Sequence, residues 1–311
     1  MLFRARSVKL RRSVTEEFAR CRKLMVMSQK VLNEQQIAFY HEHGYLLAEG
    51  VIPRDALDLA QLILERWVDQ TIQGWVDSGL LTDSLHDVDF AHRLLRAWDA
   101  AGHPRYLRSP RRDLVSREMF DFLRHPAVLD IAQDLLDTSE ILAHGIFNAR
   151  PKLPNQKWTD TPWHQDAQYY RDAEHIHVAT IWIPLQDVSE FNSCLQVAPG
   201  QHRAELYDGH NDEETGFLGL SKEVRAALTG QSIAMKAGDA LCFTQLTPHG
   251  ALPNRSDGIR WSMDVRYEAV STATESGKAQ GFVARSLQQP DQVTPYEDWL
   301  RQWETVPAGS Y

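Results

Sequence analysis

The amino-acid sequence predicts a mainly β protein supported by N-terminal helices. Two observations carry this prediction. Apolar residues recur at helical spacing up to about residue 138, and short strand-like segments separated by turn residues follow Ser139. Many short strands of this kind favour a sandwich or a barrel. We expect a single domain over residues 28–311, with helical support over 34–138 and a β core over 139–270.

The predicted helical half begins with a capped helix. Asn33 can accept the free N–H groups of a helix over residues 34–43, and Gly44 suits the left-handed position that ends it. A short strand over residues 45–52 follows. Residues 54–77 repeat apolar side chains at helical spacing, which predicts a long amphipathic helix.

The pattern becomes less regular between this helix and the β half. Residues 80–112 are rich in His, Asp and Arg without a clear period, so we expect an irregular segment. Ser116 can open a further helix, which Pro126 interrupts and residues 127–136 continue. Residues 1–27 are basic and lack an apolar run, and we expect a disordered leader there.

The β half is predicted from six short segments rich in apolar, β-branched and aromatic residues. They cover residues 141–150, 175–185, 194–198, 232–235, 240–244 and 260–269. Turn-forming residues such as Pro199-Gly200 separate them. Residues 203–230 interrupt the series as an insertion, with a helix around residues 222–228.

Composition and charge exclude several classes of protein. Hydrophobic residues make up 43% of the chain and charged residues 24%, which is typical of a globular domain. The formal net charge is −9, so we expect no nucleic-acid partner and no anionic membrane partner. No apolar run is long enough to span a bilayer. Three widely spaced cysteines, Cys21, Cys194 and Cys242, argue against a disulfide framework and favour a reducing, cytoplasmic location.

A histidine and a carboxylate two residues apart form the most informative motif. His164 and Asp166 lie in a stretch typical of a strand end, and alternate residues of a strand face the same side. We therefore expect both to bind one metal ion, joined by His249 from a distant strand. Two imidazoles and one carboxylate suit iron(II) and leave three coordination positions open. The plain alternative is that His164 and Asp166 form a hydrogen-bonded pair at the surface. A second pair with the same spacing, His210 with Asp212, lies in an acidic loop, which disfavours it as the metal-binding pair.

An arginine eleven residues after His249 completes the predicted chemistry. A dicarboxylate that chelates iron at one end leaves a second carboxylate inside the protein, where its charge must be paired. The guanidinium of Arg260 can bind that carboxylate with two N–H groups, which lysine cannot do. Ser262 faces the same side of the predicted strand and can add a hydroxyl donor. A surface strand arginine is the plain alternative.

In combination and order, these motifs resemble the phytanoyl-CoA dioxygenase family of iron(II)- and 2-oxoglutarate-dependent oxygenases over about residues 30–275. The matching stretches are Trp163-His-Gln-Asp166, Ile181-Trp-Ile-Pro-Leu185, Asn192-Ser-Cys-Leu-Gln-Val-Ala-Pro-Gly-Gln-His202, Gly238-Asp239, Pro248-His-Gly250 and Arg260. The resemblance implies a double-stranded β-helix (a jelly roll, cupin-like) wrapped by N-terminal helices. It also implies that His164, Asp166 and His249 bind the iron and that Arg260 anchors 2-oxoglutarate.

Less specific positions follow from the same resemblance. Trp182 matches an aromatic residue that flanks the co-substrate in some members, with a core tryptophan as the alternative. Asn148 and Lys152 lie where members often place a polar co-substrate contact. The Asn192-Ser193 pair departs from the usual Asn-Gly turn, which affects only a turn. Asp166 is present where halogenating relatives carry a small residue, which favours hydroxylation over halogenation.

The expected function is a dioxygenase that uses Fe(II), 2-oxoglutarate and O2. It would hydroxylate, or otherwise oxidise a C–H bond of, a small organic metabolite and release succinate and CO2. The alternatives are a non-catalytic β-roll protein that binds or senses a ligand, and a zinc-dependent hydrolase with the same three ligands. The identity of the substrate, the oxidative outcome and the oligomeric state stay open.

The substrate side is predicted from loops, because loops on a rigid scaffold carry specificity. Residues 80–112 and 203–230 are the candidates to line or cover the mouth of the site. The arginines that could meet a substrate carboxylate or phosphate, or else form a solvated basic loop, are Arg105, Arg108, Arg111 and Arg112. For Tyr169 and Tyr170, contact with substrate and packing in the core are equal alternatives. We expect His175, His177 and His202 to be structural or exposed to solvent.

Overall fold

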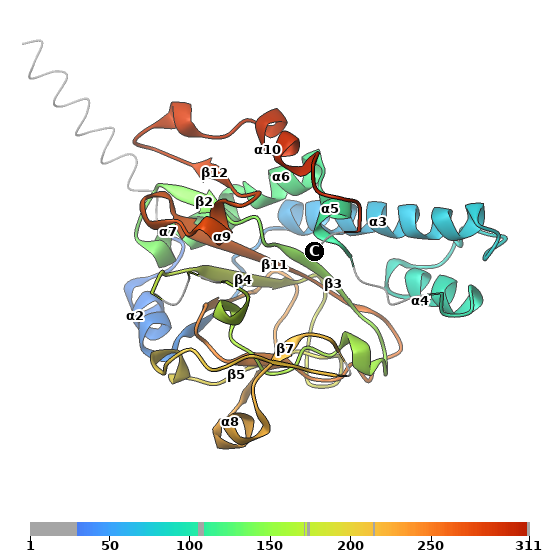
Figure 1. Cartoon of the computed structure of the whole chain (residues 1–311), viewed down its shortest axis with the longest axis horizontal. Helices are drawn as coiled ribbons and strands as arrows, with labels where there is room; N and C mark the ends of the chain where they lie inside the picture. Colours follow the sequence, from blue (N-terminus) through green and yellow to red (C-terminus); the bar gives the residue numbers. More distant parts are fainter. Residues whose placement is uncertain (1–29, 105–108, 171, 173–174, 214, 310–311) are drawn as a thin grey trace, which may run out of the picture.

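The computed structural model describes residues 30–104, 109–170, 172, 175–213 and 215–309. Its centre is a seven-stranded antiparallel sheet in the order β1-β9-β4-β11-β2-β12, with β3 also paired to β11. A three-stranded sheet, β10-β5-β8, lies on the other side of the interior from the N-terminal helices (Figure 1). The predicted double-stranded β-helix with N-terminal helices is confirmed. The expected leader, residues 1–27, lies outside the described residues.

The helices precede the sheets in the chain and cover the outer face of the larger sheet (Figure 1). They are α2 (Glu34–His43), α3 (Arg54–Asp77), α4 (Phe90–Ala100), α5 (Arg111–Leu114), α6 (Arg117–Leu123) and α7 (Pro126–Leu136). The predicted cap of the first helix is confirmed, since the Asn33 side chain accepts from the Gln36 N–H at 2.9 Å. Gly44 follows it at a φ of 79°. None of the described helices is long and apolar enough to cross a bilayer.

Helix α4 corrects the expectation that residues 80–112 are irregular. Asp89 caps it by accepting from the Ala91 N–H at 3.0 Å. Its apolar face is short and buries Leu94 and Trp98 against the helical layer. The buried Arg93 carries its positive charge inward and pairs it with Asp69 at 2.5 Å. Because the charged Arg93 occupies a position on the buried face, the spacing of apolar residues alone does not show the helical period.

The strands of the larger sheet are β1 (Tyr45–Ala48), β2 (Ile141–Ala143), β3 (Asn148–Lys152), β4 (Ala179–Pro184), β9 (Ala240–Thr244), β11 (Arg260–Ala269) and β12 (Phe282–Arg285). Those of the smaller sheet are β5 (Leu195–Val197), β8 (Gln231–Ile233) and β10 (His249–Ala251). Strands β1 and β12 lie outside the predicted β core of 139–270, so the sheet extends beyond both limits. The single strand predicted over residues 141–150 is wrong, because residues 144–147 leave the strand conformation and separate β2 from β3.

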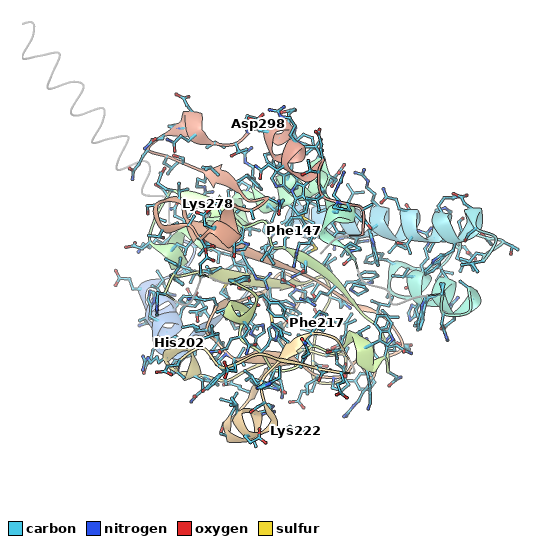
Figure 2. All side chains as sticks on the ribbon, in the orientation of Figure 1. Phe147, His202, Phe217, Lys222, Lys278 and Asp298 are labelled. Carbon is cyan, nitrogen blue, oxygen red and sulfur yellow. The ribbon has the colours of Figure 1, made fainter. Side chains whose placement is uncertain are left out.

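The remaining elements are short or lie after the sheets. They are β6 (His210–Asn211), β7 (Leu218–Gly219), α8 (Lys222–Ala227), α9 (Glu275–Lys278), α10 (Tyr296–Trp303) and the 3-10 turns η1 (Lys157–Thr159), η2 (Asp166–Tyr169), η3 (Gln201–Arg203), η4 (Val270–Thr272) and η5 (Pro290–Gln292). The insertion over residues 203–230 thus contains the hairpin β6–β7 and the helix α8. Phe217 of this hairpin is half-buried, whereas Lys222 is exposed on the protruding helix α8 (Figure 2).

Strand β11 separates the apolar core from the site. Trp261, Met263 and Tyr267 are buried in the cluster formed with the helices, and Trp261 packs against Trp67 and Phe90. Truncating a buried aromatic residue of this kind to alanine costs about 3–5 kcal/mol. The alternate residues of β11, beginning with Arg260, face the space between the two sheets. One strand therefore stabilises the fold with one face and supplies polar groups with the other.

Candidate metal centre

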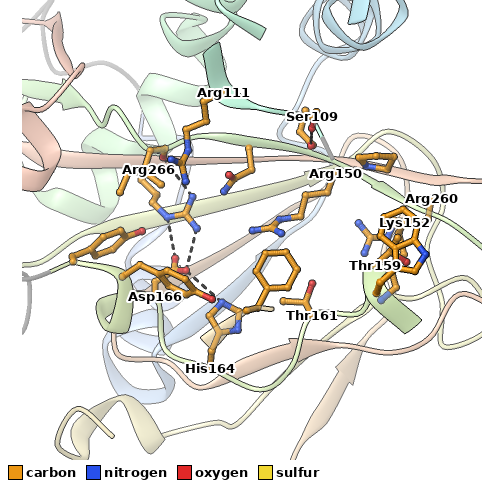
Figure 3. A pocket seen from close by; sticks show the side chains of 18 residues that line it. Ser109, Arg111, Arg150, Lys152, Thr159, Thr161, His164, Asp166, Arg260 and Arg266 are labelled. Carbon is orange, nitrogen blue, oxygen red and sulfur yellow. Dashed lines mark hydrogen bonds and ion pairs between the residues drawn. The ribbon is translucent and has the colours of Figure 1, made fainter. Parts of the chain in front are cut away.

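The segment that carries His164 and Asp166 is a bridge followed by a turn. His164 and His249 exchange two backbone hydrogen bonds of 2.9 Å, which join the segment to the smaller sheet. Asp166 then begins the 3-10 turn η2. The expectation that both residues lie along one strand is wrong in detail. Their side chains nevertheless converge, because the turn redirects Asp166 toward the same point as His164 (Figure 3).

The two imidazoles are oriented by backbone carbonyl groups. The Nδ1 of His164 lies 2.8 Å from the Pro162 oxygen, and the Nδ1 of His249 lies 2.9 Å from the Thr247 oxygen. A carbonyl only accepts, so each Nδ1 carries a proton and each Nε2 is the atom left to bind a metal ion. These Nε2 atoms lie 3.7 Å and 4.0 Å from the Asp166 Oδ1. The three potential ligand atoms lie within 4.8 Å of one another, which confirms that the predicted triad comes together.

The Asp166 carboxylate is fixed from the larger sheet. Arg266 of β11 donates to its two oxygens, from Nε at 3.1 Å and from Nη2 at 3.0 Å. Thr180 of β4 donates its hydroxyl to Oδ2 at 2.7 Å. Burial alone would raise the pKa of this carboxyl, but the charge of Arg266 holds the pKa well below its ordinary value. Asp166 is therefore an ionised ligand with a defined orientation.

The charge state of the histidines also suits a metal ion. Burial, and then the neighbouring His164, lower the pKa of His249 to about 3. The His249 imidazole is therefore neutral at physiological pH, as a metal ligand must be. The ring of Phe243 packs 4.3 Å from the His249 ring, centroid to centroid, and limits its rotation. Two imidazoles and one carboxylate, all buried, form a donor set that fits iron(II).

Arg260 is a buried cation at the other end of the site. It is 2% exposed, and its Nη1 donates to the Ser262 hydroxyl at 2.6 Å. Its buried Nε has no hydrogen-bond acceptor, and no described carboxylate lies within ion-pair distance of its guanidinium. Burial, and then the nearby Arg150, lower the pKa of Arg260 to about 9. An unpaired buried guanidinium calls for an anionic ligand, so the residues present also fit a carboxylate co-substrate.

A cavity of about 450 Å³ joins these two ends (Figure 3). Both His164 and Arg260 line it, and Asn148 and Lys152 of β3 lie along its wall. The Asn148 amide donates to Asp264 at 2.7 Å, and the Lys152 ammonium pairs with Asp160 at 2.5 Å. Trp182 does not line the cavity but lies behind Arg260, whose guanidinium carbon is 5.3 Å from the centroid of the Trp182 ring.

The comparison with known families identifies the chain. A family model described as "Phytanoyl-CoA dioxygenase (PhyH)" matches residues 40–262. The chain belongs to this family. Among curated relatives, a "Probable phytanoyl-CoA dioxygenase" of Caenorhabditis elegans is 22% identical over 248 residues, which cover 76% of this chain and 75% of the relative.

Two further comparisons come from bacteria. A "1-deoxypentalenic acid 11-beta-hydroxylase" of Streptomyces exfoliatus is 25% identical over 262 residues, which cover 75% of this chain and 80% of the relative. The crystal structure of EvdO2 from Micromonospora carbonacea var. aurantiaca, complexed with 2-oxoglutarate, superposes with a TM-score of 0.54 at 18% identity. The match covers 77% of this chain and 91% of that protein. The structural likeness shows a shared fold.

The arginines expected near the mouth of this PhyH-family site are separated by the structure. Arg111 of α5 lines the cavity. Its neighbour Arg112 points elsewhere and donates from Nε to the Val306 carbonyl at 3.3 Å. Arg105 and Arg108 lie outside the described residues. Of the two described arginines of this group, Arg111 lines the cavity and Arg112 does not.

The other predicted side chains fall into two groups. Tyr169 and Tyr170 line the cavity, although Tyr170 is also almost fully buried. The remaining histidines do not enter it: His175 is exposed, His177 contacts the Tyr40 hydroxyl at 2.9 Å and His202 contacts the His41 carbonyl at 3.2 Å. The second His-x-Asp, His210 with Asp212, is absent from the one metal-binding group found among the described residues. His210 lies in the short strand β6 rather than in a loop.

Several site residues of this family member were missed in the sequence. Arg266 and Thr180 orient Asp166, and Asp264 accepts from both Asn148 and Arg150. Three of the residues on the polar face of β11, Ser262, Asp264 and Arg266, follow Arg260 at intervals of two. The alternation that pointed to Ser262 would also have found Asp264 and Arg266.

The insertion over residues 203–230 contacts the segment that follows His164. The fully buried Gln165 donates to the Leu246 carbonyl at 2.9 Å and accepts from the Tyr207 N–H at 2.8 Å. The Tyr169 hydroxyl accepts from the Leu218 N–H at 2.9 Å. Phe217 of the same hairpin lines the cavity. The insertion and the metal-binding segment are thus joined side chain to backbone at several points.

Proposed function

We propose that this chain is an Fe(II)- and 2-oxoglutarate-dependent dioxygenase. In this proposal it oxidises a C–H bond of a small organic molecule, with hydroxylation as the favoured outcome, and releases succinate and CO2. The observation that carries the proposal is the pairing of two features in one cavity: a buried His-Asp-His triad with free Nε2 atoms, and a buried arginine without a carboxylate partner among the described residues.

The triad would hold the metal on one side only. His164 and His249 bind through Nε2, and Asp166 binds through Oδ1, which faces both rings. Facial binding leaves positions for the keto-acid and for O2. When bound, the Fe(II)–2-oxoglutarate pair supplies the oxidative chemistry, and the protein supplies position and exclusion of water. Arg266 keeps the Asp166 carboxylate ionised and correctly rotated throughout.

The co-substrate would lie between the metal and Arg260. The Arg260 guanidinium binds its distal carboxylate, and the Ser262 hydroxyl can turn to donate to the same group. Trp182 supports Arg260 from behind and flanks the co-substrate only indirectly. Asn148 lies on the cavity wall with one amide N–H committed to Asp264, so it offers its second N–H or its oxygen. Lys152 faces Arg260 across the β3–β11 pair and is a further candidate.

The named relatives support this class of reaction. One is a hydroxylase by name, and EvdO2 was crystallised with 2-oxoglutarate. A zinc hydrolase with the same ligands has no use for the buried Arg260. A sensor protein would not need a metal position left open beside the co-substrate.

The test is anaerobic binding of Fe(II) and 2-oxoglutarate to the full-length protein. We expect the weak visible charge-transfer band of a chelated keto-acid in the native protein. Asp166→Ala should abolish the band, whereas Asp212→Ala, a change at the same His-x-Asp spacing outside the site, should leave it intact. A hydrolase predicts no band. Failure to release succinate under air with any of a broad panel of substrates would favour the sensor.

A further inference from the structure

The cavity contains more positive than negative charge. Five cationic side chains line it: Arg111, Arg150, Lys152, Arg260 and Arg266. Three carboxylates stand against them, with Asp166 bound to Arg266, Asp264 bound to Arg266 and Arg150, and Asp160 bound to Lys152. The charges of Fe(II) and of doubly ionised 2-oxoglutarate cancel each other. Among the described residues two positive charges therefore stay unbalanced in a partly buried space, where unpaired charge is costly.

Arg111, like Arg260, has no ionic partner among the described residues. Its Nε donates to the Phe147 carbonyl at 3.1 Å, which fixes the base of the guanidinium. No described carboxylate lies within ion-pair distance of Arg111, and no described group accepts a hydrogen bond from its two terminal nitrogens. Burial, and then the charge of Arg266, lower the pKa of Arg111 to about 10, so it still carries its charge at neutral pH. The protein thus holds a preoriented guanidinium fork toward the cavity.

The position of Arg111 separates it from the co-substrate anchor. Figure 3 shows Arg111 entering from α5 above Arg266 and Asp166, with Arg260 on the far side of the cavity. Arg150 lies between these two ends, and its Nε donates to Asp264 at 3.0 Å, while its terminal nitrogens donate to no described group. A ligand held by Arg260 leaves Arg111 available at the metal end. The second anion must come from the other substrate.

We propose that the molecule oxidised here carries an oxyanion, a carboxylate or a phosphate, that binds the fork of Arg111 with help from Arg150. This inference rests on the proposed function, because it takes the cavity as the place where oxidation occurs. Arg111 then holds the anionic end of the substrate near the metal. Phe217, whose ring centroid lies 5.4 Å from the guanidinium carbon of Arg150, packs beside the remainder of the substrate. A neutral molecule would leave the Arg111 charge unpaired.

The experiment uses binding rather than turnover, because the natural substrate is unidentified. The full-length protein is saturated with Fe(II) and 2-oxoglutarate without oxygen, so that Arg260 is already engaged. Hexanoate, hexyl phosphate and neutral hexanamide are then titrated by calorimetry. The variants are Arg111→Gln and, as a matched control on the same helix, Arg112→Gln, whose side chain lies outside the cavity.

The native protein and Arg112→Gln should bind one anionic probe at least about 10-fold more tightly than hexanamide, because hydrogen bonds to charged groups are the stronger ones. Arg111→Gln should lose that preference, by about 10- to 100-fold. The tighter of the two anions tells whether the group is a carboxylate or a phosphate. Equal affinities of the native protein for anion and amide, including no binding of either, would overturn the inference, and this comparison does not depend on how well the variant folds.

The outcome also separates this inference from the proposed function. If 2-oxoglutarate gives no charge-transfer band, the proposed function fails, and the comparison of anion with amide still shows whether Arg111 forms an anion site. If the band forms but the preference for anions is absent, or survives in Arg111→Gln, the dioxygenase stands and the anion site is wrong.

Discussion

Arg266 determines which oxygen of Asp166 faces the histidines. Its two N–H groups bind both carboxylate oxygens from the rear, so that Oδ1 is turned toward the Nε2 atoms of His164 and His249. Groups that orient a metal ligand in this way typically contribute 10- to 100-fold to metal affinity. Arg266 is thus a positioning residue that acts through Asp166.

We expect Arg266→Gln to weaken Fe(II) binding by about 10- to 100-fold, since the carboxylate loses its orientation and its buried charge loses its partner. Metal titration monitored by calorimetry measures this loss. Arg285→Gln removes a partly buried ion pair with Asp130, 2.6 Å long and outside the site, and serves as the control. Equal metal affinities for the two variants would show that Arg266 stabilises the fold without positioning the ligand.

At the opposite end of the cavity, Arg260 should govern the 2-oxoglutarate requirement alone. A hydrogen bond to a charged group contributes about 1.5–3 kcal/mol, so Arg260→Ala should raise the dissociation constant for 2-oxoglutarate at least 10-fold. Arg260→Lys keeps the charge but loses the planar fork and should be intermediate. Fe(II) affinity, measured in parallel without 2-oxoglutarate, should not change. An unaltered 2-oxoglutarate titration in the alanine variant would remove the assigned role.

His177 shows how a partly buried histidine affects stability rather than catalysis. Burial, and then His41, lower its pKa to about 4 from an ordinary 6.5. Above pH 6.5 both the folded and unfolded forms are neutral. Between pH 6.5 and 4 only the unfolded chain takes up the proton, so the free energy of unfolding falls as the pH falls.

His177→Gln should therefore lose less stability on acidification than the native protein, by roughly 1–2 kcal/mol between pH 7.5 and 5. Urea unfolding of the metal-free proteins at both pH values measures it. Other groups titrate alike in both proteins and cancel in the comparison. Identical losses of stability in the two proteins would mean that folding does not lower the pKa of His177.

The site residues found by sequence reasoning were those whose chemistry alone marks them. Two histidines, a carboxylate and a following arginine are rare in combination, so the sequence alone predicts His164, Asp166, His249 and Arg260 as site residues. It does not predict Thr180, because nothing in the sequence distinguishes a threonine that contacts Asp166 from any other threonine in an apolar strand. Arg111 could not be told from Arg112, since only the path of the short helix α5 decides which one enters the cavity.

Among the elements, those with an unbroken period were predicted closely. Helix α3 and strand β11 have the expected bounds because their apolar residues repeat without interruption. The break between β2 and β3 has a remote cause. A Cβ on Gly145 would lie 1.9 Å from the Ala279 carbonyl oxygen, a contact with a segment 134 positions away that no local pattern reveals.

The 3-10 turn at Asp166 has a similar origin. Gln165 is drawn inward by the Leu246 carbonyl and the Tyr207 N–H, both remote in sequence. These two contacts turn the chain after His164, where local alternation predicted a continuing strand. Tertiary hydrogen bonds therefore set the ligand geometry that local propensity left undecided.

The hairpin β6–β7 is attached to the segment that carries His164 and Asp166 through a tyrosine side chain. The Tyr169 hydroxyl links the two by accepting from the Leu218 N–H at 2.9 Å. Tyr169→Phe should loosen this attachment by about 1 kcal/mol and leave the metal ligands in place. We expect more 2-oxoglutarate consumed without substrate oxidation, because the cavity closes less completely.

The measurement is the ratio of succinate formed to substrate oxidised. Tyr45→Phe is the control, since it removes a hydroxyl bonded to Gln231 at 3.2 Å, outside the cavity lining. A ratio near unity in both variants would show that the hairpin does not depend on Tyr169 for closure.

At the level of the whole molecule, the centre joins the two sheets. His249 belongs to the smaller sheet and holds His164 beside it, while Thr180 and Arg266 of the larger sheet hold Asp166. The helices support this arrangement from the far face of the larger sheet, where Trp261 and its neighbours form the core. A metal ion bound by all three ligands would therefore link the two sheets. The fold already holds the three ligands close together before the metal binds.

The most direct measurement is anomalous X-ray diffraction from crystals grown with Fe(II) and 2-oxoglutarate without oxygen. We predict one metal peak in bonding contact with Nε2 of His164, Nε2 of His249 and Oδ1 of Asp166, with the free carboxylate of 2-oxoglutarate on Arg260. A metal bound elsewhere, or a 2-oxoglutarate carboxylate directed away from Arg260, would contradict the account.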